Sequence, residues 1–198
     1  MLVTLEEMSQ DPPAPPSGLA TVRSFINTRA WDPDVEELAS PAALTAWLAD
    51  HDLAAPHEAR SAADLERARA VREALRALAA GNTGEPVAAE AVAVLEEQRR
   101  RSQLGVTFGA DGSAPIVAQA EGIDGVLGDL LAIVAHAIHD GSWVRLKACA
   151  DPTCRWAFYD SSKSHRRTWC SMEVCGNRNK VRAYRRRQRD DEAAAPAG

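Results

Sequence analysis

The four cysteines of the chain stand close together in the last quarter of the sequence. They form two pairs with four residues inside each pair and fifteen between the pairs: Cys149, Cys154, Cys170 and Cys175. Each pair can sit on a tight turn that directs two thiolates to one point, and two facing turns make a tetrahedral sulfur cage. This ligand set and geometry are preferred by structural Zn²⁺. The sequence therefore predicts a structural zinc ion bound by these four cysteines.

Two disulfides, or four unrelated thiols, are the alternatives to a metal site. Residues 1–18 contain no basic segment followed by an apolar run and a small-residue cleavage site, so they do not resemble a secretory signal. We therefore expect a cytoplasmic location, where stable disulfides are rare. Unrelated thiols would not be expected to gather symmetrically in one segment. The zinc site is the favoured interpretation.

The formal net charge of −5 conceals a strong segregation of charge along the chain. Residues 1–144 contain 22 acidic and 10 basic residues, whereas residues 145–189 contain 13 basic and 3 acidic residues. A basic metal module on an acidic body should attract a polyanion through one end only. Nucleic acid is therefore the predicted partner.

The residues around the second cysteine pair resemble a known zinc finger. The run Cys175-Gly176-Asn177-Arg178 follows Trp169-Cys170-Ser171, and Phe158-x-Asp160 lies upstream. These residues are similar to the CGNR zinc finger, which is found at the C-terminus of many bacterial proteins. The resemblance implies a bacterial protein in which the four cysteines hold zinc.

A second resemblance involves the N-terminal part of the chain. Phe25-Ile26-Asn27-Thr28-Arg29, followed by Trp47-Leu48, is similar to the Phe-x-Asn-Thr and Trp-Leu signatures of the ABATE domain. This domain usually precedes a CGNR finger, so the resemblance covers residues 17–189. Such proteins are regarded as transcription regulators or nucleic-acid-binding zinc-ribbon-like proteins. The resemblance therefore implies a zinc-dependent transcription regulator.

A strongly basic helix is predicted directly after the last cysteine. Asn177 is a favourable N-cap for a helix that runs through Arg189, with Val181 and Tyr184 as its inward positions. Arginines at helical spacing repel one another, and a phosphate backbone would relieve that repulsion. The predicted nucleic-acid-binding residues are Arg166, Arg167, Arg178, Lys180, Arg182, Arg185, Arg186 and Arg189.

Other interpretations of this basic segment remain open at the level of sequence. The helix can be a solvated charged tail, and Arg178 can instead offset the sulfur charge or pair with Asp160. DNA is favoured over RNA, although Trp169 and its aromatic neighbours would suit unpaired bases if they do not fill the module's small core. The rival hypothesis is an interaction module that docks on an acidic protein surface, including a second copy in a homodimer.

The remaining pattern predicts an α+β fold that is mainly α. We expect a flexible leader over residues 1–16, a helical domain over 17–141, the zinc module over 142–189 and a disordered tail over 190–198. Helices are expected near residues 18–29, after Ser40, after Ser61, over 87–98 and over 126–139. One β-hairpin is expected from residues 104–108 and 115–118.

The zinc module itself should contain short strands over residues 143–146 and 156–159. It is too small to fold on apolar burial alone, so metal binding should supply on the order of 10 kcal/mol of its folding free energy. Metal removal should then unfold this module and leave the helical domain intact.

No arrangement typical of an enzyme is present, and we predict no catalytic residues. His136 and His139 are interpreted as helix-end histidines rather than metal ligands. Asn27 and Thr28 are interpreted as closing a helix, although they can also line a pocket for a small-molecule effector. The apolar stretch over residues 126–138 is too short to cross a bilayer, so no membrane role is expected.

Overall fold

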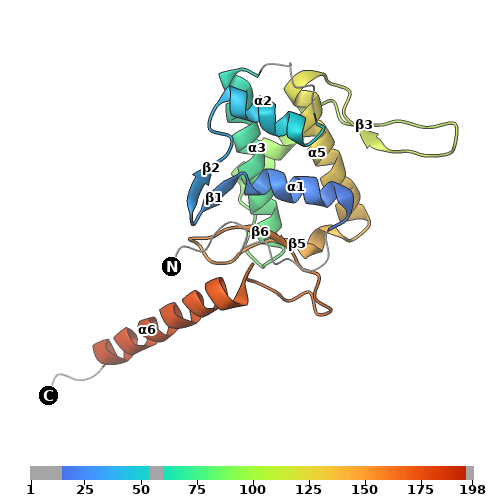
Figure 1. Cartoon of the computed structure of the whole chain (residues 1–198). Helices are drawn as coiled ribbons and strands as arrows, with labels where there is room; N and C mark the ends of the chain where they lie inside the picture. Colours follow the sequence, from blue (N-terminus) through green and yellow to red (C-terminus); the bar gives the residue numbers. More distant parts are fainter. Residues whose placement is uncertain (1–14, 54–59, 195–198) are drawn as a thin grey trace.

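The computed structural model describes residues 15–53 and 60–194, the last four of these by their backbone. Within these ranges the chain is mainly helical, with three separate two-stranded antiparallel sheets (Figure 1). The helices are α1 (Ser17–Asn27), α2 (Pro41–Asp50), α3 (Ala62–Gly81), α4 (Ala89–Arg101), α5 (Gly122–His139) and α6 (Asn177–Ala194). The predicted fold class is confirmed. Most of the predicted leader lies outside the described residues.

Two helices begin where their capping residues predict. Ser40 precedes Pro41, and its hydroxyl accepts a hydrogen bond of 3.1 Å from the Ala43 amide at the start of α2. At the start of α3, Ser61 and Asp64 each accept a hydrogen bond from the other's backbone amide, which makes a capping box. Both predicted starts are therefore confirmed, because the caps satisfy amides that the helix itself leaves unpaired.

The core of the N-terminal part lies between α1, α3 and α5. Phe25, Leu75 and Leu127 are completely buried there. Helix α5 begins before the predicted apolar stretch, and its 18 residues are long enough, by length and composition, to cross a membrane. More than half of that helix is instead buried inside the fold. The apolar residues of α5 are thus used in packing.

The N-terminal part contains two hairpins, where the sequence predicted one. The predicted hairpin is present as β3 (Gly105–Val106) paired with β4 (Ile116–Val117). The second pairs β1 (Arg29–Trp31) with β2 (Asp34–Glu36). Its strands have three residues each, too few for a recognisable alternation of apolar and polar residues. The hairpin is fixed instead by Arg72 of α3, which holds both oxygens of the Glu36 carboxylate at 2.6 and 2.8 Å.

The C-terminal module begins with a hairpin that belongs to the main core. Its strands are β5 (Leu146–Ala148) and β6 (Ala157–Tyr159), and residues 143–145 form a 3₁₀ turn rather than the predicted strand. The chain leaves α5 through Gly141, whose φ of 79° is typical of the glycine that follows the C-cap of a helix. Leu146 and Ala157 are completely buried in the same apolar cluster as α1 and α3. The hairpin is therefore shared by both parts of the chain.

Polar side chains of the N-terminal part bond the backbone of this hairpin directly. The Asn27 amide donates to the Ala157 carbonyl at 2.9 Å and accepts from the Ala157 amide at 2.8 Å, so it continues the strand pairing of β6. Asn82, after α3, donates to the carbonyls of Trp143 and Leu146. Thr28 closes α1 as predicted, through a bond to the Phe25 carbonyl. The sequence pattern indicated that Asn27 closes a helix and did not predict these bonds to β6.

Helix α6 extends away from the rest of the molecule (Figure 1). Val181 and Tyr184 are 48% and 56% exposed, so the prediction that they point inward is wrong. The helix continues to Ala194, which corrects the predicted tail boundary at residue 190. Alanine is the best helix former, and the spacing of Arg186 and Asp190 suits a favourable i,i+4 charge pair. Residues 195–198 lie outside the described part of the chain.

We expect the Asn27→Asp substitution to destabilise the protein by about 1–3 kcal/mol, because a carboxylate oxygen would face the Ala157 carbonyl. Urea denaturation followed by circular dichroism at pH 7 measures this change. The matched control is Gln103→Glu, the same change from an amide to a carboxylate at an exposed side chain just after α4, for which we expect a change within about 0.5 kcal/mol. Equal stability of Asn27→Asp and the wild type would contradict the proposed bonding role.

Candidate metal centre and basic helix

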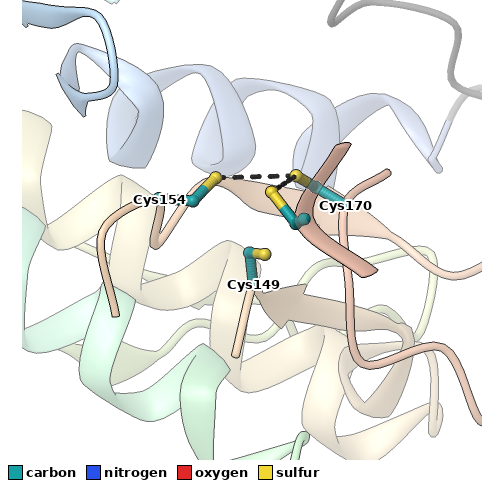
Figure 2. A group of neighbouring side chains, drawn as sticks. Cys149, Cys154 and Cys170 are labelled. Carbon is teal, nitrogen blue, oxygen red and sulfur yellow. Dashed lines mark hydrogen bonds between the residues drawn. The ribbon is translucent and has the colours of Figure 1, made fainter. Parts of the chain in front are cut away.

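The four cysteine sulfurs converge on one point. The Sγ atoms of Cys154 and Cys170 are 3.6 Å apart, those of Cys170 and Cys175 are 3.7 Å apart, and all four lie within 4.8 Å of one another. Figure 2 shows the labelled side chains directed toward a common centre. Four sulfurs at about 2.3 Å from a tetrahedral zinc ion would be separated by about 3.8 Å. The geometry therefore fits a closed tetrahedral site.

The cluster is electrostatically incomplete without a cation. The hydrogen bond with Cys154 is the main cause of a lowered pKa at Cys149, and the hydrogen bond with Cys149 is the main cause of a raised pKa at Cys170. Sulfurs at this separation share protons, because neighbouring thiolates repel each other. Zn²⁺ replaces those protons and supplies the charge that holds four thiolates together. All four positions around the ion are filled by protein, which makes the site structural.

The turn between Cys149 and Cys154 is organised by Asp151, which is completely buried. Its Oδ1 atom accepts bonds from the Thr153 amide at 3.0 Å and from the Arg182 guanidinium of α6 at 2.8 Å. Burial raises the pKa of Asp151, but bonds from Thr153 and Arg182 outweigh burial, so the net pKa lies below its ordinary value. This carboxylate therefore links the first cysteine turn to the basic helix.

The same turn is held from the N-terminal part by Arg76. Its side chain is 3% exposed and donates to the carbonyls of Ile26, Arg29 and Arg155. Arg155 follows the second cysteine and has a φ of 56°. Its guanidinium binds both carboxylate oxygens of Glu85, at 2.6 and 2.7 Å. The position of the first two sulfurs is thus set by residues far away in the sequence.

The loop between the two cysteine pairs is arranged around Asp160, which is also completely buried. Lys147 of β5 binds it at 2.9 Å and also donates to the carbonyls of His165 and Arg167. Ser162 and the Arg167 amide donate to the same carboxylate. The pairing of Arg178 with Asp160 that the sequence allowed is not formed, because Lys147 occupies that carboxylate.

The turn after Cys170 leads into α6 without a break. Ser171 caps a π-helical turn over Met172–Gly176 by accepting a bond of 3.2 Å from the Val174 amide. Asn177 has helical backbone angles, so the prediction that it caps α6 is wrong. Gly176 does not have a positive φ. A Cβ atom there would meet the sulfur of Met172, whose exposed side chain can move, and would touch the Trp169 ring at an ordinary contact distance. The cage therefore fixes the base of α6.

Family comparisons agree with this arrangement. Residues 145–188 match the CGNR zinc finger, and residues 19–140 match the ABATE model, described as "Putative stress-induced transcription regulator". The chain belongs to the ABATE family. No curated protein matches it. The resemblances to the ABATE domain and the CGNR finger are thus confirmed, and the four-cysteine cage is the zinc site of the CGNR finger.

The predicted nucleic-acid-binding residues divide into two groups. Arg178 pairs with Asp32 of the ABATE domain at 2.7 Å and donates to Thr153, while Arg182 binds Asp151. Arg167 donates to the Cys170 carbonyl and lies over the ring of Phe158 in the CGNR finger. These three arginines have internal partners. The side chains at the other predicted positions are exposed: Arg166, Lys180, Arg185, Arg186 and Arg189.

Sequence reasoning missed the polar residues by which the ABATE domain holds the finger. These residues form hydrogen bonds with carbonyls or side chains more than 60 positions away in the sequence: Arg76, Asn82 and Glu85. Contacts over such distances produce no periodic pattern in the sequence. A local signal was available for Asp151, which stands two residues before Thr153 in a Pro-containing turn and forms an Asx turn with it. The shared anchoring of the first cysteine turn could be found only in three dimensions.

The histidines of α5 take no part in the metal centre. His136 lies in the last turn of the helix, and its Nδ1 atom is 2.8 Å from the Ala132 carbonyl. Among the described residues, the four cysteines form the group whose ligand atoms can hold a metal ion together. The interpretation of His136 as a helix-end residue agrees with these contacts.

Zinc removal should unfold the part of the finger that lies outside the shared apolar core, because its ion pair with the ABATE domain, Arg178 with Asp32, is exposed to solvent and too weak to order it. With a chelator under reducing conditions, we expect amide hydrogen exchange to accelerate over residues 161–194 and to stay slow in β5, β6 and α3. The reason is that β5 and β6 share the apolar core, whereas the base of α6 contacts the cage. The Cys170→Ser variant should reproduce the pattern. Persistent protection of α6 without zinc would contradict this prediction.

Acid should weaken the loop around Asp160, whose pKa is lowered to about 2 from 3.8. Burial acts against this shift, but bonds from Ser162, Lys147 and Arg167 outweigh it. Because the pKa is lower in the folded protein, ionised Asp160 contributes stability above pH 3.8, and this contribution disappears as the pH falls toward 2. At pH 7, where the cysteines keep zinc bound, the Asp160→Asn variant should therefore be less stable than the wild type by about 2 kcal/mol in urea denaturation. Equal stability of the two proteins at pH 7 would contradict the shift.

Proposed function

We propose that the protein is a bacterial, cytoplasmic transcription regulator that binds DNA through its CGNR finger. The observation that carries the proposal is the exposed cationic surface of α6, which projects from a base fixed by the zinc cage (Figure 1). We define the basic face of α6 as its exposed cations without an internal partner among the described residues: Lys180, Arg185, Arg186, Arg187 and Arg189. Membership of the ABATE family supports a role in transcription.

The charge pattern of α6 favours a polyanionic partner. Arginines at neighbouring helical positions destabilise a helix through repulsion, and the stretch from residue 177 to residue 189 contains no acidic residue to offset them. Phosphate groups along a nucleic-acid strand would provide that compensation and would release counterions on binding. We infer that the basic face binds phosphates.

The shape of α6 favours duplex DNA over RNA. Its 18 residues span about 27 Å and its diameter with side chains is about 10–12 Å. The DNA major groove, about 12 Å wide, admits such a helix, whereas side chains cannot read the deep, narrow major groove of A-form RNA. RNA binding remains the alternative within the same class of function.

The internal arginines have a different role in this proposal. Arg178 and Arg182 connect the base of α6 to Asp32 and to the buried Asp151, so they orient the helix and leave phosphate binding to the basic face. No step of catalysis is proposed, because the closed cage leaves zinc no open coordination position.

Replacing Arg185 and Arg189 together with alanine should weaken binding to all duplex sequences about equally. We also expect the logarithmic dependence of affinity on salt to become shallower by about two, because two phosphate contacts are lost. Fluorescence anisotropy of labelled duplex DNA at several salt concentrations measures both quantities. The matched control is Arg99→Ala with Arg100→Ala in α4, where the two arginines pair with Glu96 and Glu97.

Two outcomes would count against DNA binding. Unchanged affinity and salt dependence in the Arg185 and Arg189 double variant would remove the basic face as the contact surface. Oligomers that dissociate with salt in size-exclusion chromatography, together with no binding to DNA or RNA, would favour the rival function. In that case the basic face docks on an acidic protein surface, such as the ABATE domain of a second copy in a homodimer.

A further inference from the structure

A groove of about 540 Å³ lies between the two cysteine turns and the first half of α6. Its walls include Pro152 and Trp169 from the turns and Ala183 from the helix, and Lys180 and Arg186 of the basic face also line it. This volume falls within the range of sites that enclose small organic ligands, about 300–1,000 Å³. The groove therefore shares two cations with the basic face and adds an apolar wall that contains an aromatic ring.

Small residues form part of the apolar surface in this groove. A Cβ atom at position 176 would lie 3.4 Å from Cδ1 of Trp169, so glycine adds no side chain of its own to this wall, and the Met172 side chain lies next to the same position. Ala183, a residue with a short side chain, lines the same groove. A flat aromatic group that approaches this edge of the indole would meet the Met172 side chain, which is 59% exposed and flexible and can therefore move aside.

The charges around the groove have one sign. Lys180, Arg182 and Arg186 line it together with neutral residues, and no acidic side chain does so among the described residues. Arg182 is already held by Asp151, which leaves the exposed Lys180 and Arg186 for a ligand. The site therefore combines an aromatic surface with two cations, which suits a planar ring that carries phosphate groups.

We propose that this groove binds one unpaired nucleotide of a single-stranded nucleic acid. The base stacks on Trp169, and the flanking phosphates are held by Lys180 and Arg186. The proposal rests on the proposed function and extends it, because a base inside an intact duplex is already stacked and cannot enter the groove. The finger would then bind a strand that is open at one position while the basic face follows the backbone.

The deciding experiment compares strands that carry bases with a strand that has none. Zinc-loaded full-length protein is titrated into labelled strands about 12 nucleotides long, made of oligo-dT, oligo-U or an abasic deoxyribose backbone, and into duplex DNA. We expect oligo-dT or oligo-U to bind about tenfold more tightly than the abasic strand. A base that stacks on an aromatic side chain adds binding free energy, and the abasic strand has no base to stack. Thymine also carries a methyl group that uracil lacks, so oligo-dU is included as well, and the comparison of oligo-dU with oligo-U identifies the preferred sugar.

Variants then locate the effect. Trp169→Leu should remove the preference for bases over the abasic strand, and Trp169→Phe should keep most of it. The control Phe108→Leu, at an 82% exposed aromatic residue between β3 and β4, should leave it unchanged. Ala183→Trp fills the groove from the helix without altering a neighbour of Cys170. It should also remove the preference, and the zinc content of each variant is measured.

The results separate this inference from the proposed function. Equal affinity for oligo-dT, oligo-U and the abasic strand, with binding to duplex DNA retained, would overturn the groove and leave phosphate binding intact. A preference for bases that survives both Trp169→Leu and Ala183→Trp would also overturn it. No binding to any strand or to duplex DNA would overturn the inference and the proposed function together.

Discussion

The arrangement of the C-terminal module depends on one constraint, which is that four sulfur atoms lie within 4.8 Å of one another. Their thiolates repel each other, and the apolar residues packed around them, Phe158, Trp156 and Trp169, are too few to hold the two turns together. A divalent cation reverses the sign of the interaction and turns the repelling group into a cross-link. Because Cys175 lies in the turn that leads into α6, the orientation of the basic helix depends on the same ion.

The two halves of the cage are positioned by different means. Arg76 and Glu85 fix the turn with Cys149 and Cys154 from the ABATE domain, and burial lowers the pKa of Arg76 against the opposing effect of Glu73. The half with Cys170 and Cys175 depends on the metal and on the loop around Asp160. The ABATE domain therefore acts as a rigid support for one half, and zinc transfers that support to the other half. A change in the ABATE domain near Arg76 would reach the finger through the Arg155 carbonyl.

Local patterns predicted what is determined locally. The cysteine spacing identified the metal ligands, and Ser61 marked the start of α3, because each depends on residues only a few positions apart. The contacts of Asn27, Arg76 and Asn82 with the finger depend on chain segments that meet only in the folded protein, so sequence reasoning could not find them. The inward positions assigned to α6 were wrong for a related reason. Helical periodicity identifies an apolar stripe that includes Val181, but it does not show whether another element lies against that stripe.

The arginines of α6 form two groups, those paired with aspartates at the base of the helix and those of the basic face. This division connects zinc binding with nucleic-acid binding. Arg178 and Arg182 are neutralised by Asp32 and Asp151, so repulsion is relieved at the base of the helix and remains along the basic face. A polyanion bound to the basic face would stabilise α6, and a stable α6 keeps Cys175 in its place in the cage. By thermodynamic linkage, the ion that orders the helix should then bind more tightly when the polyanion is present, and the polyanion should bind more tightly when the ion is present. Zinc is coordinated as in a structural site, and the fraction of the protein that contains zinc would nevertheless determine how well it binds nucleic acid.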